Sequence, residues 1–203
     1  MQNISRFIFV IAFFVSQTSS AAASRPVTRE ELAKQLTYYQ SISELNAKFT
    51  ETKTLKDMAL KLESDGELTV VRPVAGTTHS QVVWRVIHPS ALTVTLSEGS
   101  VKIVSGDGKT ENYAIEGSAK ESLKALVAWL KLDPEELIQS YRISQEADGA
   151  YRFEPKGEAS IAAMVMTLQP GSYLEQLRIE EKSGDSLLIR FQKPTLKKAS
   201  HAK

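Results

Sequence analysis

Two hydrophobic periods alternate along the chain, and the first is helical. Leu32, Leu36 and Tyr39 recur at the i, i+4, i+7 spacing of one helix face. Thr28 and Glu31 precede this stripe with the three-residue spacing of a capping box, which marks the start of a helix. These positions predict an amphipathic helix.

Beyond this helix, apolar residues alternate with polar ones, as they do on a half-buried strand. Leu45, Ala47 and Phe49 show this alternation most clearly. A Ser-Asp-Gly turn is predicted at 64–66, before the strand that ends near Arg72. Short runs rich in Val, Leu and Ile follow, separated by Gly, Pro and Asp. The further predicted strands are 59–62, 81–87, 92–96, 101–104, 143–145, 151–153, 162–168, 174–180 and 187–191.

The helical period returns in the middle of the chain. Ser118 and Glu121 have the capping-box spacing, and an apolar stripe follows them through Leu130. A shorter helix is predicted from Pro134 to about Tyr141, since proline is tolerated at the first helical position. The pattern as a whole favours an α+β fold, in which a large antiparallel sheet, closed or half-closed into a barrel, carries helices against one face.

The first 23 residues have the composition of a cleavable secretory signal. Arg6 is the only charged residue before Arg25, residues 7–15 are nine consecutive apolar residues, and three alanines end at Ala23. Nine residues are too few to cross a bilayer, which needs about 20. We therefore expect cleavage after Ala23 and a periplasmic location.

Composition limits the possible partners. Removing residues 1–23 takes away one Arg, so the formal net charge of +1 falls to zero, which argues against nucleic acid as the main partner. The chain has no cysteine, so an exported domain must be stabilised by burial alone and cannot carry a lipid on a cysteine. We expect one domain over 24–193, free in solution as a monomer, and a disordered basic tail over 194–203.

The sequence offers no catalytic or metal-binding constellation. His79, His88 and His201 lack metal-ligand spacing, and no Ser lies in a Gly-x-Ser-x-Gly motif. Residues 106–110 (GDGKT) resemble the end of a phosphate-binding loop, but Ile103 stands where that loop needs another glycine. A turn between two strands is the better interpretation. We therefore expect a protein that is not an enzyme and uses no cofactor or metal.

Two interpretations of the apolar sheet face remain open. Composition alone favours an ordinary core under a layer of helices. The alternative is a concave face that mobile helices seal and that opens to a hydrophobic guest.

Three motifs follow one another in the first half of the chain. Residues 36–54 (LTYYQSISELNAKFTETKT) join a helix to an Ala-x-Phe-Thr strand, residues 66–73 read GELTVVRP, and Trp84 and Pro89 are separated by four residues. Their order resembles the LolA family of periplasmic lipoprotein carriers. The resemblance implies an incomplete antiparallel β-barrel with an α-helical lid. It also implies that the protein shuttles acylated lipoproteins, or related envelope lipids, from the inner to the outer membrane.

The same resemblance implies partners and site residues. The partners would be an inner-membrane release complex and an outer-membrane acceptor. Arg72 matches the family's Arg before Pro, which closes the lid by hydrogen bonding; the residues alone favour an Arg whose charge reaches solvent. A non-transporting lipid-sensing or protein-interaction module with the same fold is the alternative function. The predicted cavity lining is Ala47, Phe49, Leu68, Val70, Trp84 and Val86 from the sheet, and Leu126, Trp129 and Leu130 from the helix.

Overall fold

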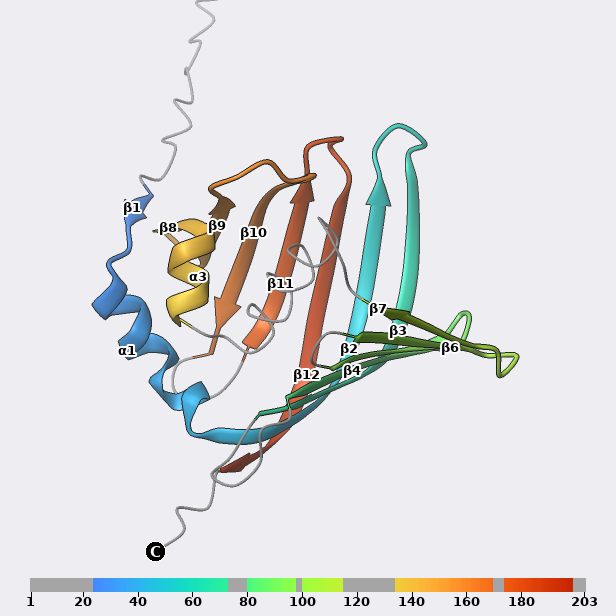
Figure 1. Cartoon of the computed structure of the whole chain (residues 1–203). Helices are drawn as coiled ribbons and strands as arrows, with labels where there is room; N and C mark the ends of the chain where they lie inside the picture. The colour runs from blue at the N-terminus through green and yellow to red at the C-terminus, as the bar shows by residue number, and fades with distance from the viewer. Residues whose placement is uncertain (1–23, 73–79, 98–99, 115–133, 170–173, 199–203) are drawn as a thin grey trace, which may run out of the picture.

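The computed structural model describes residues 24–72, 80–97, 100–114, 134–169 and 174–198. Within them, twelve strands form one antiparallel sheet, and two helices lie beside it (Figure 1). The strands are β1 (Arg25–Pro26), β2 (Ile42–Leu55), β3 (Leu60–Val71), β4 (Gln81–His88), β5 (Leu92–Ser97), β6 (Ser100–Ser105), β7 (Thr110–Ala114), β8 (Tyr141–Gln145), β9 (Tyr151–Pro155), β10 (Ile161–Leu168), β11 (Leu174–Glu181) and β12 (Ser186–Lys198), and the helices are α1 (Arg29–Gln40) and α3 (Pro134–Ser140).

The sheet is strongly bent but not closed. Its strand order is β1-β8-β9-β10-β11-β12-β2-β3-β4-β5-β6-β7, so β1 and β7 form two separate edges. Figure 1 shows β4 to β7 lying at a steep angle to β8 to β12, with β2 passing through the bend. The predicted fold class, an incomplete antiparallel barrel with helices at one face, is confirmed.

The start of α1 is the predicted capping box. The Glu31 amide donates to Thr28 Oγ1 (3.2 Å), and the Thr28 amide donates to the Glu31 carboxylate (3.0 Å). The predicted stripe of Leu32, Leu36 and Tyr39 is buried, with at most 2% of each side chain exposed. These residues belong to the same apolar core as the sheet, so α1 covers one sheet face.

The turn predicted at 64–66 is wrong, because β3 runs without interruption from Leu60 to Val71. Ser64 and Asp65 pair with residues of β2, and this long antiparallel ladder overrides the local turn preference. The hairpin turn lies earlier, where the Ala59 amide donates to the Lys56 carbonyl (3.1 Å) and Ala59 has a φ of 49°. The region expected to be a turn is instead an irregular point in the ladder between β3 and β4.

The disordered tail expected from residue 194 is also wrong as far as Lys198. β12 continues to Lys198 along β2, with Thr195 opposite Asn46 and with Lys197 Nζ 2.7 Å from Glu44 Oε2. The register shifts between Gln192 and Thr195, around a proline that has no amide hydrogen to donate. The sequence-based strand stopped early because the last residues are mostly basic, whereas pairing with a long neighbour needs only their backbone. Residues 199–203 lie outside the described structure.

The other predicted strands are confirmed with longer bounds. The helix predicted from Pro134 to about Tyr141 ends at Ser140, because Tyr141 begins β8. The GDGKT segment is the turn between β6 and β7, and β7 itself was not predicted. The second helix expected near residues 118–130 lies outside the described part of the chain, as does the predicted signal segment. None of the helices that the structure describes is long and apolar enough to span a membrane.

Candidate functional site

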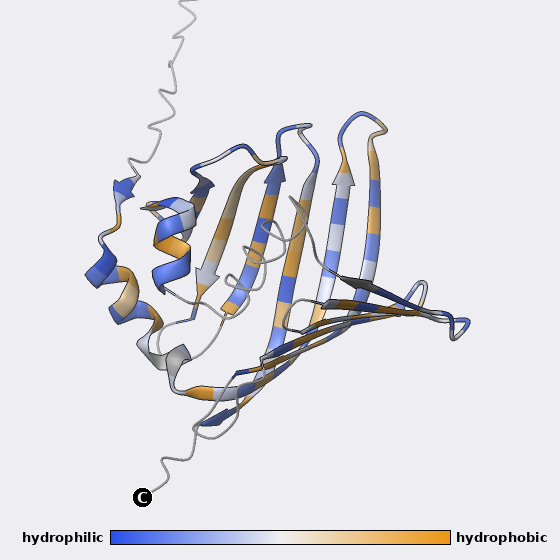
Figure 2. Cartoon of the chain, viewed as in Figure 1, coloured by the Kyte–Doolittle hydropathy of each residue, from blue (hydrophilic) through white to orange (hydrophobic). Residues whose placement is uncertain are grey.

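The six predicted sheet residues lie on one face of the bend. The β-ladder places Ala47 opposite Leu68, which lies opposite Trp84, while Phe49 and Val86 flank Gly66 in the next row. We call the face that carries these side chains the inner face, and the face with the alternate residues the outer face. Ala47, Phe49, Leu68 and Val70 are buried, and Trp84 and Val86 are half-buried and pack against them. Figure 2 shows the resulting alternation of apolar and polar bands along these strands.

Gly66 allows an aromatic pair to form in the middle of the inner face. A Cβ atom on Gly66 would lie 2.7 Å from Phe49 Cζ and 2.0 Å from the Arg85 carbonyl oxygen. The Phe49 ring therefore occupies space that only a glycine leaves free. Its centroid lies 4.1 Å from that of Trp84, at an interplanar angle of 30°. Steric contact with Phe49 and the Arg85 carbonyl thus explains why the first residue of the GELTVVRP motif is a glycine.

Arg72 joins the end of β3 to the end of α1. Its amide donates to the Ser43 carbonyl (2.9 Å), and Nη1 of its guanidinium donates to the backbone carbonyl of Tyr39 in the last turn of α1. Carbonyl groups in the last turn of a helix have no partner within the helix and carry partial negative charge, so they suit a cationic donor. Arg72 therefore contacts the helix that covers the inner face, and its side chain is only partly exposed.

The space under this contact is small. A cavity of about 20 Å³ lies between Arg72 and the apolar side chains of the inner face. That volume is of the order needed for a single water molecule. A space of this size among the described residues does not hold an acyl chain. The lining consists of Leu45, Ala47, Leu68, Val70, Arg72, Leu174, Phe191 and Pro194.

One acidic side chain shares the inner face. Glu51 follows Phe49 by two residues on β2 and lies opposite Ile189, which is buried. Burial raises the pKa of the Glu51 carboxyl, while the nearby Lys53 acts to lower it. Lys53 also lies 3.5 Å from Glu181. These charges mark the end of the apolar rows toward the β2–β3 hairpin.

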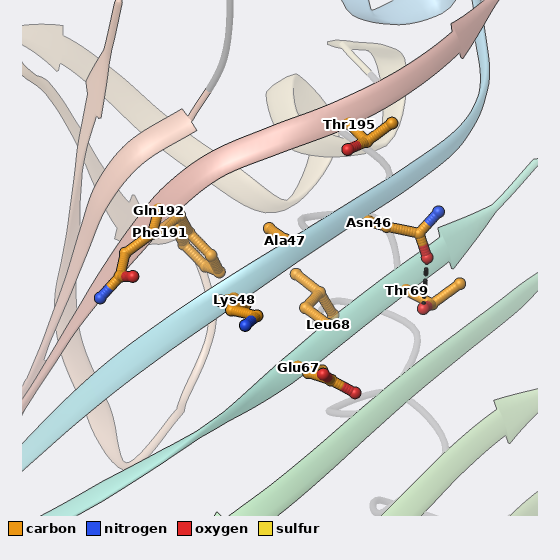
Figure 3. A pocket seen from close by; sticks show the side chains of 9 residues that line it. All are labelled: Asn46, Ala47, Lys48, Glu67, Leu68, Thr69, Phe191, Gln192 and Thr195. Atoms are coloured by element: carbon orange, nitrogen blue, oxygen red, sulfur yellow. Dashed lines mark hydrogen bonds between the residues drawn. The ribbon is translucent and has the colours of Figure 1, made fainter.

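A second hollow, of about 840 Å³, lies over β12, β2 and β3 and is lined by both polar and apolar side chains (Figure 3). Thr69 Oγ1 donates to Asn46 Oδ1 (2.7 Å), and Asn46 Nδ2 donates to Glu44 Oε1 (2.7 Å). By strand alternation, Asn46 and Thr69 belong to the outer face. This hollow was not predicted from the sequence. It is lined by Asn46, Ala47, Lys48, Glu67, Leu68, Thr69, Phe191, Gln192 and Thr195.

The predicted site missed two residues that line the cavity, and it includes three residues that the structure does not describe. Leu45 and Phe191 line the inner-face cavity although they were not among the predicted residues. The alternation of Leu45 with Ala47 and Phe49 was a sufficient signal for the first, whereas Phe191 needed the pairing of β12 with β2. The three helix residues, Leu126, Trp129 and Leu130, lie outside the described residues and remain a prediction.

The described residues hold little that suggests catalysis. No group of three or more His, Cys, Asp or Glu side chains that could hold a metal ion occurs among them. His88 Nδ1 lies 3.1 Å from the Asp65 carboxylate on an exposed part of the surface. His79 and His201 fall outside the described ranges.

An open, bent antiparallel sheet with an apolar inner face under a helix defines the class of LolA-like proteins. The chain belongs to the LolA family, described as outer membrane lipoprotein carrier protein LolA, which matches residues 40–203. This family consists of carrier and binding proteins of the cell envelope. None of the curated proteins compared is similar enough in sequence to count as a relative.

Among the solved structures compared, one with a TM-score above 0.5 supports the same fold at low sequence identity. A DUF1329 family protein from Desulfovibrio piger aligns over 85% of this chain and 93% of its own, with 10% identity and a TM-score of 0.51. A LolA superfamily protein from Nitrosomonas europaea aligns over 84% of this chain and 94% of its own, with 8% identity and a TM-score of 0.43. The MucA/MucB complex of Pseudomonas aeruginosa contains a chain with 10% identity and a TM-score of 0.47; 85% of this chain aligns with 58% of that one.

Proposed function

We propose that the protein is a periplasmic carrier that binds the acyl chains of lipoproteins, or of related envelope lipids, on the inner face. It would move them from the inner to the outer membrane and catalyse no reaction. The observation that carries the proposal is the hydrogen bond from Arg72 to the Tyr39 carbonyl, because it holds α1 over an apolar surface by a bond that can break. The family membership supports the same function.

Energetics favour a reversible closure of this kind. A sixteen-carbon chain exposed to water costs roughly 12 kcal/mol, at about 0.8 kcal/mol per CH₂ group. A charge-assisted hydrogen bond contributes about 1.5–3 kcal/mol, so the cargo can readily displace it. Cargo would then pack against Leu45, Ala47, Leu68 and Val70, which line the cavity beside Arg72, and α1 would close again after release.

The remaining parts of the proposal follow from the sequence and the family. Residues 1–23 would direct export and be removed. Leu126, Trp129 and Leu130 would complete the cavity, and Arg72 would act as the lid latch. The cargo would come from an inner-membrane release complex and pass to an outer-membrane acceptor.

Native mass spectrometry of the protein purified from its own periplasm tests the proposal. We expect a fraction of the protein to carry a diacyl or triacyl species, and delipidated protein to take up a fluorescent acylated lipoprotein and transfer it to acceptor vesicles. Protein that purifies without lipid and neither loads nor transfers the acylated probe would contradict the proposal.

A second candidate is a non-transporting lipid-sensing or protein-interaction module of the envelope. The small volume, about 20 Å³, of the inner-face cavity that the described residues line favours this candidate, because a module that binds partners through its surface needs no larger cavity. A lipid-free protein that co-purifies with one envelope protein in a fixed ratio would support this candidate over the carrier.

A further inference from the structure

The exposed large hydrophobic side chains of the described residues gather on one hairpin. Met58, Leu60 and Leu62 are 70%, 43% and 48% exposed, and all three belong to the β2–β3 hairpin. We propose that the tip of this hairpin, residues 56–62, docks on an anionic lipid bilayer. This surface does not depend on the cargo role proposed above, because it can bind a bilayer with or without an acyl chain on the inner face.

The apolar side chains of the tip are placed together by the strand register. Leu60 lies opposite Leu55, and Leu62 lies opposite Lys53. Because side chains alternate along a strand, Leu60 and Leu62 share the inner face with Leu68. Met58 lies in the turn itself. The tip therefore carries three apolar side chains at the far end of β2 and β3, beyond Glu51 and Lys53.

The tip has a defined shape before any partner binds. The Ala59 amide donates to the Lys56 carbonyl (3.1 Å) and closes the turn. The Lys56 amide in turn donates to Asp185 Oδ1 (2.9 Å) in the neighbouring β11–β12 turn. The Lys56 side chain lies against Gly184 of that turn. Contacts to a second hairpin thus hold the tip, which lowers the entropy cost of docking.

Charge complementarity favours an anionic bilayer. Residues 56–62 contain Lys56, Lys61 and one acid, Asp57, a net charge of +1. Neither lysine forms an ion pair within the described structure, in contrast to Lys109 on the β6–β7 turn, whose Nζ lies 2.9 Å from Asp107. Apolar side chains flanked by lysines enter the headgroup region while the lysines contact anionic lipids.

The size of the patch favours a bilayer over a protein partner. A specific protein interface buries more than about 1,000 Å² in total, which needs many residues on each side. Three apolar side chains on one protruding turn provide much less than that. A fluid bilayer, in contrast, adapts its surface to a small apolar tip.

Vesicle co-sedimentation of the purified, cargo-free protein tests the proposal. The vesicles are pure phosphatidylcholine or phosphatidylcholine mixed with phosphatidylglycerol. We expect binding to the mixed vesicles that weakens as salt is added. Met58→Ser/Leu60→Ser/Leu62→Ser should weaken it by at least about tenfold. Lys56→Gln/Lys61→Gln should weaken it by about fivefold for each lysine.

The matched control is Lys102→Gln/Lys109→Gln, which removes the same charge from another hairpin. It should bind within about twofold of the wild type. Since all the altered side chains are exposed, circular dichroism and thermal unfolding should show that each variant is folded. The proposal is overturned if the wild type does not bind mixed vesicles, if the serine variant binds as tightly, or if the control loses as much binding. A wild-type dimer that becomes monomeric in the serine variant would also overturn it, since the patch would then join two copies.

Discussion

The rings of Phe49 and Trp84 lie in contact, with their centroids 4.1 Å apart, on the inner face of the sheet. Since Trp84 is half-buried there, a guest on this face should change its surroundings. We expect a shift in the emission of Trp84 when a fatty-acyl probe binds to the Trp129→Phe variant. The Trp84→Phe variant is the control for emission from Trp129. An unchanged emission spectrum with bound probe would place the guest elsewhere.

Gly66 should tolerate no larger side chain. In Gly66→Ala, the new Cβ meets the Arg85 carbonyl and the Phe49 ring, so the backbone or the ring must move. We expect the free energy of unfolding in urea to fall by about 1–3 kcal/mol. Gly157→Ala is the control, because its Cβ would meet no atom within 4 Å. Equal stabilities for the two variants would contradict the steric role of Gly66.

Arg72→Leu tests the contact between β3 and α1. The variant loses the hydrogen bond to the Tyr39 carbonyl and adds apolar surface to the cavity, so the closed state is weakened relative to the loaded one. We expect it to load an acylated probe but to release it to acceptor vesicles more slowly than the wild type.

The control for this experiment is Arg85→Leu on the outer face, where the exposed Arg85 lies 3.4 Å from Glu67. Its loading and transfer should match those of the wild type, and its stability should change by no more than about 0.5 kcal/mol. If Arg72→Leu also loads and transfers like the wild type, Arg72 does not act as a latch.

Glu51 should make stability depend on pH. Burial raises its pKa above the ordinary 4.5, so the folded state binds the proton more tightly than the unfolded chain. Stability is therefore lost as pH rises through the window between the unfolded and the folded pKa. Glu51→Gln should unfold at a higher urea concentration than the wild type at pH 7, and this gain should disappear below about pH 4. Glu63→Gln, on an exposed part of β3, is the control; a pH-independent gain for Glu51→Gln would contradict the role of charge.

The last part of β12 should contribute to stability. A chain that ends at Lys193 loses the pairing of Thr195 to Lys198 with β2 and the partly buried Leu196. We expect a loss of about 1–3 kcal/mol in the free energy of unfolding. A chain that ends at Lys198 keeps these contacts and serves as the control. If both chains unfold at the same urea concentration, this pairing does not stabilise the fold.

Much of the fold could be predicted because the relevant signals are local. The capping box of Thr28 and Glu31 needs only four consecutive residues, and both of its hydrogen bonds are present. The alternation of Ala47 and Phe49 with polar neighbours likewise decides which side chains share a face, whatever strand lies beside them. For the same reason the six sheet residues of the predicted cavity were found together on the inner face.

The missed features depend on partners far along the chain. Residues 64–66 have the composition of a turn, yet β2 holds them in a continuous strand. Phe191 reaches the cavity only because β12 pairs with β2, about 140 residues earlier in the sequence.

By itself, the sequence determined the helix starts, the strand faces and the identity of the apolar residues, since side-chain period and capping act within a few residues. Only the tertiary structure decided the register between strands, the extension of β12 to Lys198, and the partner of Arg72. One acceptor of that guanidinium is the backbone carbonyl of Tyr39. Every residue carries a backbone carbonyl, so the sequence cannot show which one accepts a hydrogen bond from Arg72. The bend of the sheet and the position of the end of α1 bring the Tyr39 carbonyl within reach of Arg72.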